Sequence, residues 1–141
     1  MRMTGGVRML PGGIAGALQR AGIGPDDGTL DVMAFETILA EFGPDLLSRV
    51  AASFRAEAQG ALDALDTAVA ARDAVAAGQQ CHFIKGSALY LALGRLSGLC
   101  ERLEGEARSG ECPGPDAAAS LRAEVIHGLD ALIALGLLTD R

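Results

Sequence analysis

The longest regular pattern in the sequence is a stripe of apolar residues that follows Pro44 and recurs every three or four positions. This spacing places the side chains on one face of an α-helix, and such a face is typical of a helix that packs along a bundle. The stripe consists of Leu47, Val50, Phe54, Ala58, Ala61, Leu65 and Ala68. The pattern therefore predicts one long helix of a helical bundle.

Four further segments have apolar residues at helical spacing, and no segment has the period-2 alternation of a half-buried strand. Thr29 can cap the first of them, which Gly43 and Pro44 end, and Asp73 can cap the next. Proline and aspartate at the start of the last segment also suit a helix N-terminus. We expect these helices over about residues 29–42, 73–90, 96–107 and 115–132.

The composition agrees with a helical core. Hydrophobic residues make up 50% of the chain but aromatic residues only 4%, with no Trp, so Leu, Ala, Val and Ile must fill the interior. Short loops between long helices favour antiparallel neighbours. We therefore predict an all-α fold, an antiparallel up-down four-helix bundle with the helix over residues 29–42 packed across one end.

The first 28 residues differ from the rest of the chain, because they contain eight glycines and two prolines. Such a backbone loses much conformational freedom when it becomes ordered. We expect residues 1–28 to form a flexible Gly-rich segment with one short turn of helix around residues 14–20. Residues 29–141 are expected to form a single bundle domain.

The charge excludes two classes of partner. The net charge is −6 and the pI is near 4.8, so the protein's field repels nucleic acid and anionic membrane surfaces. The most apolar C-terminal run, Leu129 to Leu138, is far shorter than the roughly 20 residues of a membrane span. Cys81, Cys100 and Cys112 form neither a CxxC pair nor a metal-ligand pattern, which indicates free thiols and a cytoplasmic protein.

The segment over residues 73–90 presents an unusual outer face. At about 100° per residue, Ala77, Cys81, Ile84, Ala88 and Leu91 fall on the core side. Lys85, the only lysine in the chain, lies one turn from a histidine on the opposite side, and Gly86 stands where a better helix former is expected. This outer face consists of Val75, Gly78, Gln79, His82, Lys85, Gly86 and Leu89.

The outer face suits phosphoryl chemistry, although a solvated histidine beside a lysine without function is the alternative. A neutral imidazole is a competent nucleophile, and the Lys85 ammonium can offset the charge of a phosphoryl group on His82. Gln79 can add a hydrogen bond. Because no acid, base or metal cluster accompanies them, the electrophile must be activated by another protein. We expect no cofactor in this chain and Mg²⁺ on the partner.

At this point the sequence resembles the histidine-containing phosphotransfer (HPt) domains of bacterial phosphorelays over about residues 30–135. The stretch from His82 to Ser87 matches the HxxKGS motif, and the register continues through Leu91, Leu96, Cys100 and Leu103-Glu104. The resemblance implies that His82 is phosphorylated, that Lys85 steadies the phosphoryl group and that Gly86 admits a receiver domain. The chain departs from the family at residues 90–93, where Tyr-Leu-Ala-Leu replaces the frequent Asn-Leu-Gly-Ala and leaves the turn undetermined.

The expected function is therefore that of a phosphoryl carrier between aspartates of receiver domains, in response regulators or hybrid histidine kinases. Gln79, Gly86, Leu89, Gly78 and Val75 are expected to contact the partner. No nucleotide-binding signature supports ATP-dependent kinase activity, and no apolar stripe is left over for dimerisation, so we expect a monomer. Two alternatives stay open: a non-phosphorylated interaction module that regulates a kinase or response regulator, and a fragment of a larger kinase.

Other chemistry-bearing residues have simpler interpretations. His127 is expected on the surface, and Cys81 and Cys100 in the core. Phe83 and Tyr90 are expected to pack at the flank of their helix. The charged residues Glu101, Arg102, Glu104 and Arg108 are expected to form a solvated outer face.

Overall fold

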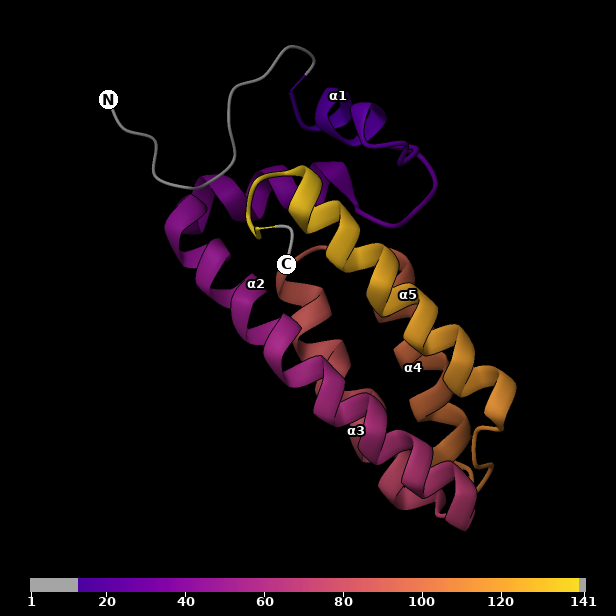
Figure 1. The fold of residues 1–141 in the computed structure, drawn as a ribbon. Helices are drawn as coiled ribbons and strands as arrows, with labels where there is room; N and C mark the ends of the chain where they lie inside the picture. The colour runs from indigo at the N-terminus through magenta and orange to yellow at the C-terminus, as the bar shows by residue number, and fades with distance from the viewer. Residues whose placement is uncertain (1–12, 140–141) are drawn as a thin grey trace.

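A computed structural model describes residues 13–139, and over this range the chain is entirely helical with no strand (Figure 1). Its helices are α1 (Gly13–Arg20), α2 (Val32–Ala71), α3 (Ala74–Tyr90), α4 (Gly94–Arg108) and α5 (Pro115–Ala134). The predicted all-α class is confirmed. The expected flexibility of residues 1–12 lies outside the described residues, and the domain boundary at residue 29 stays a prediction.

The four longer helices lie side by side and enclose one core (Figure 1). Helix α2 contacts α3 and α5, and α4 contacts the same two helices. Within the stripe predicted on α2, every member except the partly buried Val50 is buried. The facing helices supply Ile84, Leu96, Leu103, Leu121 and Leu132. Burial of these aliphatic side chains is the main source of stability in a domain with few aromatic residues.

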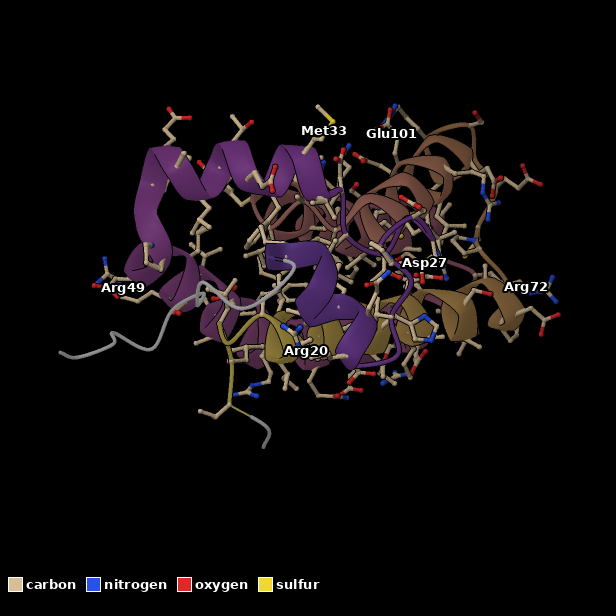
Figure 2. The ribbon with its side chains drawn as sticks, turned by 90° about the horizontal axis from the view of Figure 1, so that it is seen from above. Arg20, Asp27, Met33, Arg49, Arg72 and Glu101 are labelled. Atoms are coloured by element: carbon tan, nitrogen blue, oxygen red, sulfur yellow. The ribbon has the colours of Figure 1, made fainter. Side chains whose placement is uncertain are left out.

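Helix α2 contains the break that the sequence predicts between residues 42 and 44. Gly43 has φ 82° and ψ 160°, which is outside the helical region, and Pro44 follows it. Figure 2 shows the resulting change of direction between Met33 and Arg49. The N-cap differs from the prediction: Asp31, not Thr29, caps the helix, because its carboxylate accepts a hydrogen bond from the Ala34 backbone N–H at 3.1 Å.

Residues 13–28 contribute to the core, although the sequence suggested a flexible segment. Ile14, Ala17 and Leu18 of α1 are buried, and α1 contacts α5. The segment contains a short amphipathic helix, whose apolar side chains lie three and four residues apart, despite its high glycine content. The turn of helix expected around residues 14–20 is therefore present and packed.

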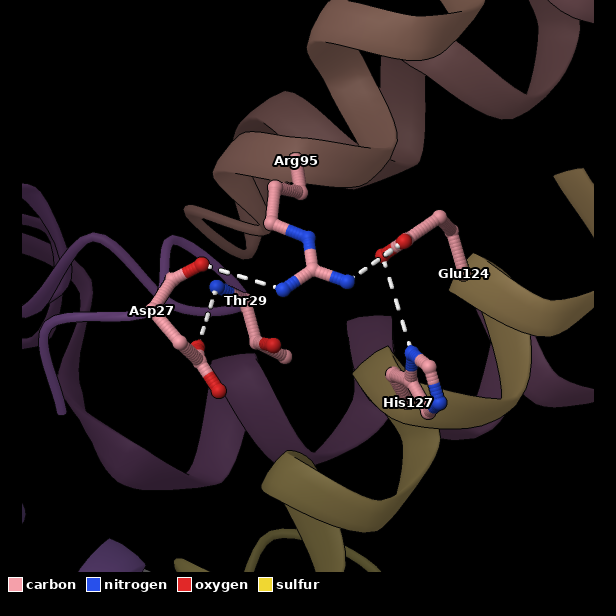
Figure 3. A network of polar contacts seen from close by, with 5 residues as sticks. All are labelled: Asp27, Thr29, Arg95, Glu124 and His127. Atoms are coloured by element: carbon pink, nitrogen blue, oxygen red, sulfur yellow. Dashed lines mark hydrogen bonds and ion pairs between the residues drawn. The ribbon is translucent and has the colours of Figure 1, made fainter. Parts of the chain in front are cut away.

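A polar network fixes the segment before α2 to the rest of the bundle (Figure 3). The Arg95 guanidinium on α4 donates a hydrogen bond to the Asp27 carbonyl oxygen at 3.0 Å and forms an ion pair with Glu124 of α5 at 2.6 Å. Gly28 is required beside it, because φ is +90° and a Cβ would lie 3.0 Å from the Arg95 Cδ. One arginine thus joins the loop, α4 and α5.

The turn between α3 and α4, where the sequence departs from the resembled family, is tight. Ala92 adopts φ 57°, a left-handed conformation that favours glycine. Its carbonyl oxygen accepts a hydrogen bond from the Asp31 backbone N–H at 2.8 Å. The turn therefore also anchors the start of α2, and alanine occupies the conformation that the family's glycine would suit.

None of the helices among the described residues is long and apolar enough to cross a membrane.

Candidate functional site

Helix α3 begins as predicted and has the predicted core face. The Asp73 carboxylate accepts a hydrogen bond from the Ala76 backbone N–H at 3.1 Å, which caps the helix. The residues Ala77, Cys81, Ile84 and Ala88 are buried. Because these four side chains take up the core face, the residues between them face the flanks toward α2 and α4 or the solvent.

His82 lies on the open side of α3, with 69% of its side chain exposed. It lines a hollow of about 630 Å³ between α3 and α4. Predicted site residues contribute most of the α3 wall of this hollow, and α4 contributes a wall with Glu104 and Arg108. The α3 wall contains Val75, Gly78, Gln79 and His82. Of the other predicted residues, Lys85, Gly86 and Leu89 continue along α3 beyond the hollow.

The position of Glu104 differs from the one that the sequence predicts. It was expected on a solvated face, but only 15% of its side chain is exposed, and it lies between α3 and α4. Its Oε2 is 2.9 Å from the His82 Nδ1 and its Oε1 is 2.8 Å from the Lys85 Nζ. The Arg108 guanidinium, one turn along α4, is 3.4 Å from Oε2. One carboxylate therefore contacts both residues predicted to carry the chemistry.

The ion pair also changes the position of Lys85. Its side chain was expected to be exposed, but it is only 19% exposed because the ammonium turns toward Glu104. This contact raises the pKa of the Lys85 ammonium above its ordinary value. The Lys85 contact lowers the pKa of the Glu104 carboxyl, burial opposes that change, and the His82 contact adds to it. Both groups are charged at neutral pH.

Small residues bring the two helices close enough for these contacts. A Cβ on Gly78 would lie only 3.1 Å from the Ala107 Cβ, so α3 and α4 lie close together one turn before His82. At Gly86, by contrast, a Cβ would meet no heavy atom of the described structure within 4 Å. Internal packing therefore explains the glycine at position 78 but not the one at position 86.

Apolar side chains on the wall of the hollow and farther along α3 remain accessible. Val75 is 70% exposed and Leu89 57%. Phe83 and Tyr90, which were expected to pack, are about half exposed, and the Tyr90 ring meets the Phe42 ring edge-on at 6.3 Å. Single exposed apolar residues are ordinary, but several near one open nucleophile form a surface suited to a partner protein.

The remaining candidates behave largely as predicted. The three cysteines are free thiols, and Cys81 and Cys100 are buried. Burial, assisted by the charge of Glu104, raises the pKa of the Cys81 thiol to about 11, so this thiol is protonated and unreactive at neutral pH. His127 is a surface residue 3.8 Å from Glu124. Among the described residues, no cluster of three His, Cys, Asp or Glu side chains could hold a metal ion.

Comparison with known proteins gives one match. The family model for the Hpt domain matches residues 49–135, which include His82, Lys85 and Glu104. No curated protein and no solved structure gives a significant match to the chain.

Proposed function

Because this chain belongs to the Hpt domain family, whose members are phosphocarriers in phosphorelays and not kinases, we propose that His82 carries a phosphoryl group between aspartates of receiver domains. The observation that supports this most directly is the placement of His82. Its ring is open to solvent in a hollow, and its Nδ1 is anchored to a carboxylate. A carrier needs both an accessible nucleophile and a fixed orientation.

The partner's role follows from what this site does not supply. Phosphoryl transfer needs charge neutralisation at the donor, and we propose that a Mg²⁺ ion bound by the receiver provides it there. Val75, Gly78, Gln79, Gly86 and Leu89 are proposed to contact the receiver. The position of Val75, Gly78 and Gln79 on the wall of the hollow, the exposure of Leu89 and the unfilled space at Gly86 support this assignment.

The proposed scaffold is an antiparallel up-down bundle of α2 to α5, with residues 32–42 packed across one end. Its support is the length of the connections: two residues join α2 to α3 and three join α3 to α4. Such short connections favour antiparallel neighbours. The contacts between α4 and α5 and between α5 and α2 support the same order.

Phosphotransfer from a charged receiver tests the function. A receiver domain labelled with a small phosphodonor and Mg²⁺ is mixed with the protein, and transfer is followed over time. The expected product is a phosphoramidate on His82, which is stable in base and lost in acid, and which peptide mapping can locate. Binding of receivers without transfer, and equal binding by the His82→Ala variant, would instead favour a regulatory interaction module.

Lys85→Ala is expected to slow transfer by on the order of 10- to 100-fold, because it removes a cation that lies one turn from His82 on α3 and contacts the same carboxylate. Single-turnover rates with a saturating receiver measure this effect. Arg102→Ala is the matched control, because Arg102 is an exposed cation on α4 that pairs with Glu106 at 3.3 Å. Equal rates for the Lys85 variant and the wild type would remove Lys85 from the mechanism.

Gly86→Ala is expected to raise the free energy of unfolding by about 0.5–1 kcal/mol, because alanine is the better helix former and its Cβ meets nothing. Gly86→Leu is expected to slow transfer by obstructing the receiver. Denaturant unfolding and transfer rates measure the two effects. Gly60→Ala, at another helical glycine with free space around it, should give the stability gain alone. Normal transfer by Gly86→Leu would show that the receiver does not approach position 86.

A further inference from the structure

We infer that the outer surface of α5 binds a second copy of this chain, so that two copies pair through antiparallel α5 helices centred on Ile126. The inference does not rest on the proposed carrier function. Its basis is a row of apolar side chains on the side of α5 that faces away from the core, together with two opposite charges placed symmetrically about Ile126. The sequence predicts a monomer instead, because it assigns the apolar stripes to the core.

Helix α5 has apolar side chains on two sides. One set is buried in the core. A second set recurs every three or four residues on the outside, where Ile126 is 52% exposed. One exposed isoleucine is ordinary, but this one lies in the middle of a row about 21 Å long at 1.5 Å per residue. This row, the α5 ridge, contains exposed or partly exposed side chains only: Ala119, Ala123, Ile126, Leu129 and Ile133.

The surface beside the α5 ridge is hollowed. Two hollows of about 500 and 600 Å³ lie between α5 and α2. Both are lined by Ile126 and by Arg122, which lies one turn before it on α5. The ridge therefore has room beside it for the side chains of another helix.

The α5 ridge is self-complementary about Ile126. When a two-fold axis through this residue relates two antiparallel helices, each position before it faces the position equally far after it on the other copy. Ala119 then faces Ile133 of the second copy, and Ala123 faces Leu129. A small side chain meets a large one at each of these places, which favours close packing.

Two charges follow the same symmetry. Arg122 lies four residues before Ile126 and Asp130 four residues after it, so each arginine faces an aspartate of the second copy. Asp130 is exposed, and in the part of the chain that the structure describes no hydrogen bond or ion pair engages its carboxylate. The Arg122 guanidinium is 2.7 Å from the Asp66 carboxylate of α2, but its five N–H donors can bind a second carboxylate. This charge complementarity selects a second copy as the occupant.

The α5 ridge lies away from the surface around His82. Helix α2 contacts α3 and α5, and α4 contacts the same two helices, so the α2 and α5 side of the bundle is opposite the α3 and α4 side (Figure 1). The hollow that His82 lines is between α3 and α4. A dimer formed through α5 therefore leaves both of these hollows open.

Sedimentation equilibrium of the full chain tests the inference. Between about 5 µM and about 1 mM, the average mass is expected to rise from the 14.4 kDa of one chain toward twice that value. We expect a dissociation constant on the order of 10–100 µM, because one helix of each copy provides most of the contact. A mass that stays at that of one chain over the whole range would overturn the inference.

Ile126→Arg is expected to raise the dissociation constant at least about 100-fold, because two like charges then meet at the axis. The residue is half exposed, so the variant should fold, and far-UV circular dichroism checks this. Met33→Arg, at an apolar residue of α2 that is 79% exposed and lies outside the ridge, is the control and should dimerise like the wild type. Equally tight dimers in Ile126→Arg and the wild type would place the contact elsewhere and overturn the inference.

Exchange of the two charges tests the antiparallel arrangement. Asp130→Arg and Arg122→Glu each bring like charges together in a homodimer, so each is expected to weaken dimerisation by about tenfold. An equimolar mixture of the two variants restores opposite charges at both places and should form a heterodimer about as tight as the wild-type dimer. If the mixture associated no more tightly than either variant alone, the pairing centred on Ile126 would be wrong.

Discussion

His82→Gln is expected to abolish phosphorylation by any charged receiver domain and to leave the fold unchanged. The glutamine amide can occupy the space of the imidazole, but it has no nucleophilic nitrogen that could accept the phosphoryl group. The side chain is 69% exposed, so the substitution should change the free energy of unfolding by no more than about 0.5 kcal/mol. Gel-based transfer assays and denaturant unfolding measure the two quantities.

The second histidine of the chain provides the control for this experiment. His127 on α5 is also about half exposed and lies beside a glutamate, but it lines no part of the hollow around His82. His127→Gln should be phosphorylated at the wild-type rate. Residual acid-labile label in His82→Gln, or its loss in His127→Gln, would contradict the assignment of the acceptor.

Phe54→Ala is expected to lower the free energy of unfolding by about 3–5 kcal/mol. Phe54 is only 2% exposed and lies in the middle of the α2 stripe, so truncation leaves a cavity between helices that cannot close fully. Urea unfolding followed by far-UV circular dichroism measures the change. A loss of this size is a large part of the stability of a small domain and is expected to reduce the yield of folded protein.

Met33→Ala is the control for the core variant, because Met33 lies on the same helix and is 79% exposed. Its effect should stay within about 0.5 kcal/mol of zero. If the two variants lost similar stability, the burial of the α2 stripe would not be the source of the difference, and the assignment of the core face would have to be revised.

The helices and their core faces could be predicted because periodicity is a local property of the sequence. The stripe containing Leu47 and Leu65 determines which side of α2 is buried, and the same reasoning located the core face around Cys81. Local signals also located the break at Gly43 and the cap at Asp73. They failed at the start of α2, where Thr29 and Asp31 are both acceptable caps and tertiary contacts select one.

The N-terminal helix shows a different limit. Glycine content predicts how much freedom a segment loses on ordering, but not how much apolar surface it can bury in return. Leu18 is fully buried, and α1 packs against α5, which begins about a hundred residues later in the sequence. No window around residues 13–20 contains this information.

The site was predicted only as far as one helix presents it. His82 and Lys85 lie one turn apart on α3, so their proximity follows from helix geometry. Glu104 belongs to α4, where four charged residues lie close together in the sequence. Their pattern does not distinguish a carboxylate that faces the solvent from one that lies between two helices. The motif register did include Leu103-Glu104, and that was the available signal for a role at this position.

The contact between Gly78 and Ala107 divides the surface around His82 into two parts that can evolve at different rates. A side chain at position 78 would place its Cβ 3.1 Å from the Ala107 Cβ, so α3 and α4 would have to shift apart slightly beside the contact between the imidazole and its carboxylate, whichever receiver is present. Val75 and Leu89 are free of that constraint because they face the solvent. A lineage can therefore change partners by substitutions at the rim while the spacing of the reacting groups is inherited unchanged.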